Sequence, residues 1–275
     1  MTRLLPALLA FAPFAAVASA QPSFGNRVQA GLVDDRTTDA DVRALATKYP
    51  GLQDLDIGWP GMTDLALKAV AKLTTIETLH IRNSSIYSRD GRVKRVALTA
   101  DGWKALRGLT NLRELSVNDT TIDEAAMKEI GQLRQLSTLY LAHNEVTDAG
   151  VCHLAGMTQL TKLGLLQKDI TDKSVPTLMK LQKVETLLVD QTGLTDAAVK
   201  LFAGLPALAN IDVRAEKVTA EGVSALSACK TLRWLTVVQR QAPADVLGTL
   251  RGGNGKLHVS ITDVGKYLEP TATGR

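Results

Sequence analysis

A threonine-centred block recurs in this chain every 24 residues, and a fixed period of this length predicts a solenoid, not a globular core. The block begins at five threonines and at one aspartate that fills the missing phase: Thr99, Asp123, Thr147, Thr171, Thr195 and Thr219. With the threonine as position 1, apolar residues fall at positions 5, 8, 11, 14, 17, 19 and 24, as in residues 195–218. One such unit cannot bury its own apolar face, so the units must stack on one another.

Each unit predicts a short helix followed by a short strand. Apolar residues three apart at positions 5, 8 and 11 suit one face of a helix, and those two apart at 17 and 19 suit one face of a strand. Position 1 is followed by aspartate in Thr147-Asp148, Thr171-Asp172 and Thr195-Asp196. Either side chain can accept from a free N–H in the first turn, so we predict that the pair caps its own helix.

Positions 14–24 read L-x-x-L-x-L-x-x-x-x-[IVL], as in LSTLYLAHNEV at residues 136–146. This pattern resembles the leucine-rich repeat family, and the whole unit is similar to its bacterial and ribonuclease-inhibitor-like members. The resemblance implies an α/β solenoid over residues 38–261, with about eight to nine repeats. It implies a curved right-handed horseshoe, with a parallel sheet on the concave face and helices on the convex face.

The family usually carries Asn or Cys at position 22, where the side chain bonds the backbone of the turn. Only Asn144 matches here, whereas Lys168, Glu216 and Arg240 cannot bond the turn in the same way. We therefore expect the turns at those three positions to be looser or bonded differently.

The two ends of the chain differ in composition from the repeats. Residues 1–20 have an early cation, an apolar stretch and a final Ala18-Ser19-Ala20, a pattern typical of a signal peptide cleaved after Ala20. We expect an exported protein, periplasmic or secreted, with no membrane span after cleavage. An uncleaved anchor is the alternative, although the apolar run is shorter than the ~20 residues of a spanning helix. Residues 21–37 are predicted to be an N-terminal leader or cap, and residues 262–275 a C-terminal tail.

The charge and motif content argue against several classes of function. The formal charge of +4 falls to +3 without the signal peptide, and no basic face stands out, so we expect no nucleic-acid partner. No nucleophile elbow, metal motif or phosphate-binding glycine loop appears. We therefore expect no enzyme activity, no cofactor, no catalytic or metal site, and a monomer.

Two cysteines in an exported chain would ordinarily suggest a disulfide. Here Cys229 falls at core position 11 and Cys152 at position 6, which should face solvent. They lie three repeats apart, which is at least ~14 Å at the strand spacing of a sheet and beyond the ~7 Å that a disulfide spans. We predict two free thiols, one buried and one exposed.

The period is interrupted once, by twelve extra residues at 87–98. This segment contains the turn pair Asp90-Gly91, which favours a projecting hairpin or loop. Its basic residues are Arg89, Arg92, Lys94 and Arg95. The insertion is either a functional loop or a tolerated surface insertion with solvated charges.

Positions 16, 18 and 20 should point to the concave face because they alternate with the buried positions 17 and 19. The candidate binding residues comprise an apolar patch, charged neighbours and one tryptophan: Tyr140, Ala142, Leu166, Leu188, Asp190, Asp212, Arg214 and Trp234. Leu257, Val259 and Ile261 predict a last strand, in which we align His258 with Thr236 at position 18.

Three further residues, Asp54, Asp56 and His80, gather at the amino end of the concave face. They fit a metal or acid–base site, or an ordinary surface ion pair.

The sequence therefore predicts an exported, non-enzymatic scaffold that binds a protein or peptide on its concave sheet. The alternative is a structural or carbohydrate-binding protein of the cell envelope, with Tyr140 and Trp234 as platforms for sugars.

Overall fold

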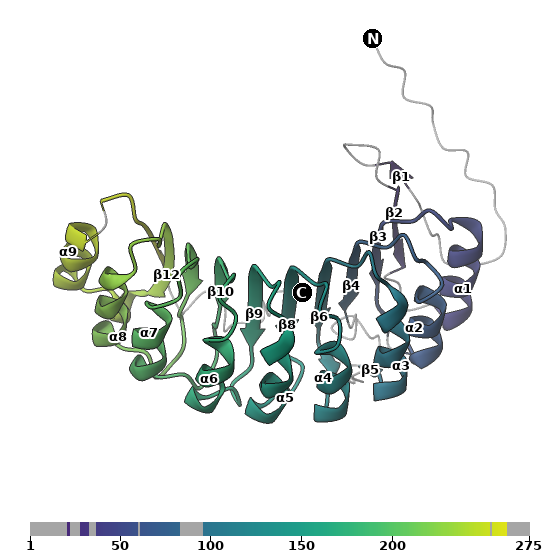
Figure 1. Ribbon diagram of the computed structural model, residues 1–275, viewed down its shortest axis with the longest axis horizontal. Helices are drawn as coiled ribbons and strands as arrows, with labels where there is room; N and C mark the ends of the chain where they lie inside the picture. Colours follow the sequence, from purple (N-terminus) through teal and green to yellow (C-terminus); the bar gives the residue numbers. More distant parts are fainter. Residues whose placement is uncertain are drawn as a thin grey trace, which may run out of the picture.

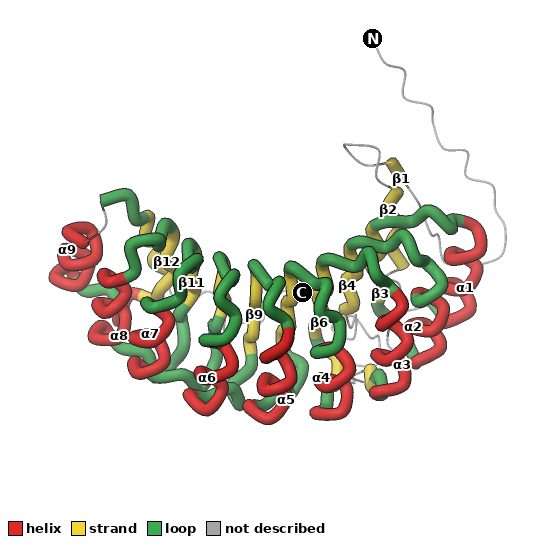
Figure 2. Tube along the Cα trace, in the orientation of Figure 1, coloured by secondary structure: helices red, strands yellow, loops and turns green. Residues whose placement is uncertain are grey.

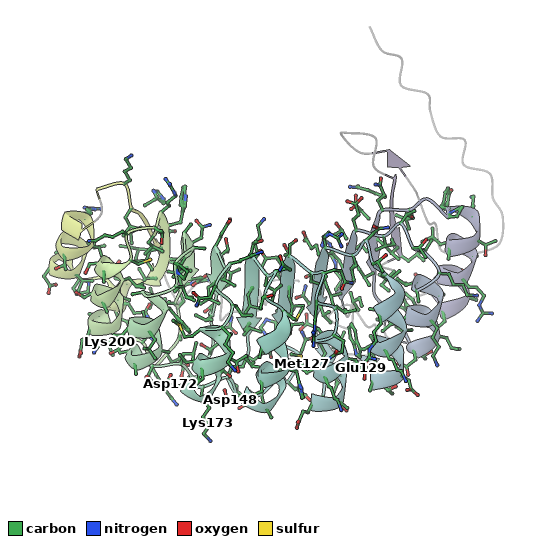
Figure 3. All side chains as sticks on the ribbon, in the orientation of Figure 1. Met127, Glu129, Asp148, Asp172, Lys173 and Lys200 are labelled. Atoms are coloured by element: carbon green, nitrogen blue, oxygen red, sulfur yellow. The ribbon has the colours of Figure 1, made fainter. Side chains whose placement is uncertain are left out.

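The computed structural model describes residues 21–22, 28–32, 37–59, 61–82, 96–253 and 255–262. These residues form an arc with strands along the inner side and helices along the outer side (Figure 1). Figure 2 shows the same division by element type, with green loops joining each helix to the strands before and after it. The predicted solenoid, with its parallel sheet on the concave face, is confirmed.

The main sheet has eleven strands, and each repeat adds one strand beside the strand of the preceding repeat. Only β1 runs antiparallel to its neighbour. The strands, in sheet order, are β1 (Gln21–Pro22), β2 (Val28–Leu32), β3 (Asp54–Ile57), β4 (Thr78–Arg82), β6 (Glu114–Asn118), β8 (Thr138–Ala142), β9 (Lys162–Leu166), β10 (Thr186–Leu188), β11 (Asn210–Asp212), β12 (Trp234–Val238) and β13 (His258–Thr262).

Short helices cover the outer side of the sheet, one α-helix to a repeat, and several continue into or begin as a 3-10 turn. The helices are α1 (Asp39–Lys48), α2 (Asp64–Val70), α3 (Ala100–Ala105), α4 (Glu124–Ile130), α5 (Asp148–Cys152), α6 (Val175–Leu178), α7 (Asp196–Phe202), α8 (Ala220–Ala225) and α9 (Ala244–Gly253). The 3-10 turns are η2 (Leu106–Gly108), η3 (His153–Gly156), η4 (Asp172–Ser174), η5 (Leu226–Ala228) and η6 (Gln239–Gln241).

The core is a continuous row of apolar side chains between the helices and the sheet. Position 8 is fully buried in successive repeats, as at Ile130, Leu154 and Phe202, and so are positions 17 and 19 of the strands, as at Leu139 and Leu141. Burial of each such side chain contributes about 1.5–3 kcal/mol. Because its neighbours supply most of that burial, a repeat is stable only inside the stack.

Position 1 caps its helix as predicted, but the aspartate at position 2 does not. The hydroxyls of Thr63, Thr99, Thr171, Thr195 and Thr219 accept the N–H two residues ahead at 3.2–3.4 Å. The aspartate instead accepts from the threonine of the next repeat. Its Oδ1 takes the backbone N–H at 2.7–3.1 Å, and its Oδ2 takes the hydroxyl. We call this row of inter-repeat bonds the Asp–Thr ladder.

The ladder requires a small residue at position 4, a signal that the sequence analysis did not use. At Gly102 an added Cβ would lie 2.4 Å from Oδ1 of Asp64, and at Gly222 it would lie 2.2 Å from Oδ1 of Asp196. Ser174 fills the same position and donates its hydroxyl to Asp148 at 2.5 Å. The carboxylate of one repeat therefore occupies space that the next repeat leaves empty.

The ladder is interrupted at two successive interfaces in the middle of the described arc. Ala100 supplies no carboxylate to Asp123, which caps its own helix by accepting from Ala126 N at 2.7 Å. Glu124 replaces the aspartate before Thr147, and its carboxylate lies 3.6 Å from His153. Thr147 has no side-chain cap bond.

Two of the turns without asparagine at position 22 have a bonding glutamine at a neighbouring position. Asn144 is fully buried, accepts Thr120 N–H at 2.9 Å and donates to Val117 O at 2.6 Å. Gln167, at position 21, accepts the N–H of Asn144 at 2.9 Å. Gln241, at position 23, donates to three carbonyls at 3.0–3.1 Å. The turns at Lys168 and Arg240 are thus bonded differently, as expected.

Both cysteines are free, with Cys229 buried and Cys152 exposed, as predicted. Of the insertion at 87–98, the structure describes only 96–98. Strand β5 (Val96–Ala97) pairs in parallel with β7 (Thr120–Thr121) in a separate two-stranded sheet. No helix in the described part of the chain is long and apolar enough to cross a membrane.

The ladder predicts the stability of variants at position 2. Burial raises the pKa of Asp148, but hydrogen bonds from Ser174 and Thr171 outweigh it, so the pKa lies below its ordinary value. We expect Asp148→Asn to lower the free energy of unfolding by about 1 kcal/mol at pH 7, near the low end for a bond to a partly solvated charge. A lowered pKa stabilises the fold above the unfolded pKa and loses that contribution as the pH falls. Urea unfolding at pH 7 and pH 3 should show the deficit shrinking at pH 3.

Glu124 is the matched control because it occupies the same repeat position outside the ladder. Glu124→Gln should change the free energy of unfolding by less than about 0.5 kcal/mol, as for an exposed charge. Glu124→Asp should not lower it, since a shorter carboxylate is the one that bonds the next threonine elsewhere. An equal loss in Asp148→Asn and Glu124→Gln would contradict a stabilising role for the ladder.

Candidate functional site

The concave face consists of the outward residues at positions 16, 18 and 20 of strands β3 to β13, which no helix covers (Figure 1). The parallel register places residues of equal position directly beside one another. Ser116, Tyr140, Gly164 and Leu188 thus form one continuous row. The eight candidate binding residues all lie on this face, on strands β8 to β12 or directly after them.

Tyr140, Ala142, Leu166 and Leu188 form the predicted apolar patch, and each is half-buried. The Tyr140 ring occupies the space above Gly164, where an added Cβ would lie 2.5 Å from its Cδ1. Burial raises the pKa of Tyr140, and the negative charge of Glu114 raises it further. Gly164 thus positions the ring, a role that sequence reasoning missed although a glycine inside a strand often marks such a close approach.

Asp190, Asp212 and Arg214 form a charged trio beside the patch. Arg214 donates to both oxygens of Asp212, with Nη2 at 2.7 Å from Oδ2, and its Nη2 lies 3.0 Å from Oδ2 of Asp190. The two carboxylate side chains are only 10% and 11% exposed. One cation therefore faces two nearly buried carboxylates, so the trio has a formal net charge of −1.

Burial raises the pKa of Asp190, Arg214 lowers it and Asp212 raises it, and the resulting pKa lies above the ordinary value. A carboxyl with a raised pKa favours the fold at low pH, and this contribution is lost as the pH rises through the folded pKa. The positive charge of Arg214 therefore offsets part of the repulsion between the two carboxylates at neutral pH.

Trp234 is 54% exposed, and among the described residues it is the large apolar side chain most open to solvent on the concave face. Its ring centroid lies 4.2 Å from that of His258, at 55°. The pairing of β12 with β13 places His258 beside Trp234, and Ser260 beside Thr236. The expected alignment of His258 with Thr236 was therefore wrong by two residues, because the strict 24-residue period continues into β13.

The amino-end residues do not form one site. Asp56 bonds Arg82, and His80 Nε2 lies 3.2 Å from Oε1 of Glu114. Gln29 donates to Asp54 at 3.3 Å. No group of three or more metal-ligating side chains occurs in the described ranges. Asp56 and His80 are neighbours in the sheet, but each pairs with a different residue, which fits the surface ion-pair interpretation.

The basic residues of the insertion, Arg89, Arg92, Lys94 and Arg95, lie outside the described residues.

The trio predicts a pH-dependent stability change. Arg214→Met leaves two nearly buried carboxylates without a cation, so the free energy of unfolding should fall by about 3 kcal/mol at pH 7. The loss should shrink toward pH 4 because protonation removes the uncompensated charge. Urea unfolding at both pH values measures this loss.

Arg82→Met is the control, since that guanidinium is 53% exposed and its pair with Asp56 should contribute less than about 1 kcal/mol. Equal losses for the two variants would refute the special role of the trio.

Solved structures provide comparisons for this fold. An internalin (InlF) of Listeria monocytogenes matches 81% of this chain and 63% of its own length, with 18% identity and a TM-score of 0.53. A leucine-rich-repeat protein of Leptospira interrogans matches 82% of this chain and 57% of its own length, with 18% identity and a TM-score of 0.50. This chain therefore spans less than two thirds of either protein.

No protein-family model matches the chain, and no curated protein matches its sequence. The 24-residue repeats, the parallel sheet and the two structural matches together identify the chain as a leucine-rich-repeat solenoid.

Proposed function

We propose that this chain is a non-enzymatic binding protein that takes a protein or peptide on its concave face. The observation that carries the proposal is the exposed Trp234, stacked on His258 on the side of the sheet that no helix covers. Exposed apolar groups rimmed by polar ones often mark contact sites, and tryptophan and tyrosine are frequent anchors in interfaces.

The dimensions of the face fit an extended ligand. Tyr140 and Trp234 lie four strand spacings apart, which is about 19 Å along the sheet. An extended peptide covers that length with about six residues. Such a peptide would cross the apolar patch and the charged trio before it reached Trp234.

Binding would require little additional ordering of the side chains on the concave face. The Tyr140 ring already rests above Gly164, and Arg214 is already held by two carboxylates. Since both side chains are already held in place, binding would cost less side-chain entropy than it would on a loop surface.

We infer that the protein acts after export, because residues 1–20 have the composition of a signal peptide. The mass of the chain recovered from the periplasm or the medium should correspond to a first residue of Gln21. A chain that stays in the cytoplasm with Met1 in place would contradict export and leave the concave-face proposal standing.

The binding proposal predicts which variants lose a partner. The double variant Tyr140→Ala/Trp234→Ala should capture at least ten times less of a specific protein from the source organism than the wild type, as measured by quantitative mass spectrometry. Its melting temperature should change little, because both residues lie on the concave face of the sheet and outside the apolar core.

Leu201→Ala is the matched control, since Leu201 is also 54% exposed but belongs to α7 on the helical side. It should leave capture unchanged. Capture that is indifferent to Tyr140 and Trp234 would contradict the proposal. Retention of a glycan in place of a protein, lost in the same double variant, would favour the carbohydrate-binding alternative.

A further inference from the structure

The concave face has a charge opposite to that of the chain as a whole. Its residues at positions 16, 18 and 20, from β3 to β13, include five carboxylates and three cations, a formal net charge of −2, whereas the chain carries +4. The carboxylates are Asp54, Asp56, Glu114, Asp190 and Asp212, and the cations are Arg82, Lys162 and Arg214. An acidic surface on a basic chain favours a basic partner, because complementary potentials steer encounter and select orientation.

The acidic groups lie next to the aromatic rings. Glu114 lies on β6 beside β8, and its charge acts on the Tyr140 hydroxyl, whose pKa it helps to raise after burial. The Glu114 side chain is 37% exposed, and its Oε1 lies 3.2 Å from Nε2 of His80. A partly exposed carboxylate and the half-buried ring of Tyr140 therefore lie on neighbouring strands of the concave face.

The same combination recurs at the other end of the face. Trp234 on β12 pairs with Asn210 on β11, two residues before Asp212. Asp212 belongs to the trio, whose net charge is −1 because one guanidinium faces two carboxylates. Each of the two aromatic side chains on the face thus has a carboxylate on the neighbouring strand.

We propose that the concave face takes a basic segment of a protein partner, an extended stretch in which lysine or arginine side chains alternate with apolar ones. This inference rests on the proposed function and adds the chemistry of the ligand. A cation over the Tyr140 ring gains from the ring quadrupole and from a charge-assisted hydrogen bond to Glu114. Its aliphatic stem packs on Leu166 and Leu188, as such stems do on apolar surfaces.

The net negative charge of the concave face also argues against a polyanionic partner. Nucleic acids and anionic membrane surfaces require clustered cations that neutralise phosphates. Two of the three cations of the concave face are instead held by carboxylates: Arg82 by Asp56, and Arg214 by Asp190 and Asp212. The third, Lys162, stands alone in its strand and forms no cluster of cations.

The test measures binding of fluorescein-labelled octalysine and octaglutamate to the purified chain by fluorescence anisotropy at 50 mM salt. Octalysine should bind at least ten times more tightly than octaglutamate. Asp54→Asn/Glu114→Gln should weaken octalysine binding at least fivefold. Asp245→Asn/Glu216→Gln removes the same two group types from exposed sites off the concave face and should weaken it less than twofold.

A second pair of variants tests whether the aromatic ring of Tyr140 contributes to binding. Tyr140→Phe keeps the aromatic face and should bind octalysine within twofold of wild type, whereas Tyr140→Leu should lose at least threefold. Circular dichroism melts of all variants separate lost binding from lost folding.

Three results would overturn the inference: no preference for octalysine, equal losses in the two double variants, or equal binding by Tyr140→Phe and Tyr140→Leu. Equal losses would mean diffuse attraction to the whole chain. If a protein partner is still captured through Tyr140 and Trp234, these results reject the basic ligand and leave the proposed function intact.

Discussion

Each repeat depends on its neighbours to bury its apolar residues, and every other feature of the structure follows from that dependence. A helix of four to seven residues, as in α2 to α8, is too short to be stable alone in water. It persists because position 8 lies against the strand of its own repeat and the helices on either side. The resulting core is linear, so the sheet can have one face buried and the other open along its whole length.

The polar bonds between repeats fix how the units stack. The Asp–Thr ladder satisfies the backbone N–H of each N-cap threonine with a carboxylate from the preceding repeat, and the buried Asn144 and Gln241 satisfy turn carbonyls in the same inter-repeat manner. These bonds are directional, whereas apolar burial is not, so they specify the stagger of one repeat on the next. Where the ladder is absent, around Asp123 and Thr147, the strand pairing continues in full register. The arc therefore continues without the ladder at these two interfaces, which Asn144 and Gln167 cross with other hydrogen bonds.

The open face of the sheet carries groups that stability does not require. Trp234 exposes a large apolar ring to solvent, and the trio holds two carboxylates close together against their mutual repulsion. Both features are costly in a surface that only needs to be soluble, which is why we assign them to contact with a partner. The net negative charge of the same face favours a basic partner.

The sequence by itself determined the architecture, because period and apolar spacing are local properties. Positions 8, 17 and 19, the free thiols, and the membership of Tyr140, Leu166 and Leu188 in one outward patch all followed from counting residues along the chain. The placement of His258 was also available from the strict period, because it lies 24 residues after Trp234.

Only the tertiary structure decided which groups bond to one another across repeats. Asp148 could have capped its own helix, and what directs it to Thr171 is the space left by the small residue at position 4 in the next repeat. Tyr140 leans over Gly164, and Arg214 joins two carboxylates on different strands, since side chains of neighbouring strands meet at about 5 Å whatever their distance in sequence. A repeat pattern states which way a side chain points, and the distances between stacked repeats determine what it meets.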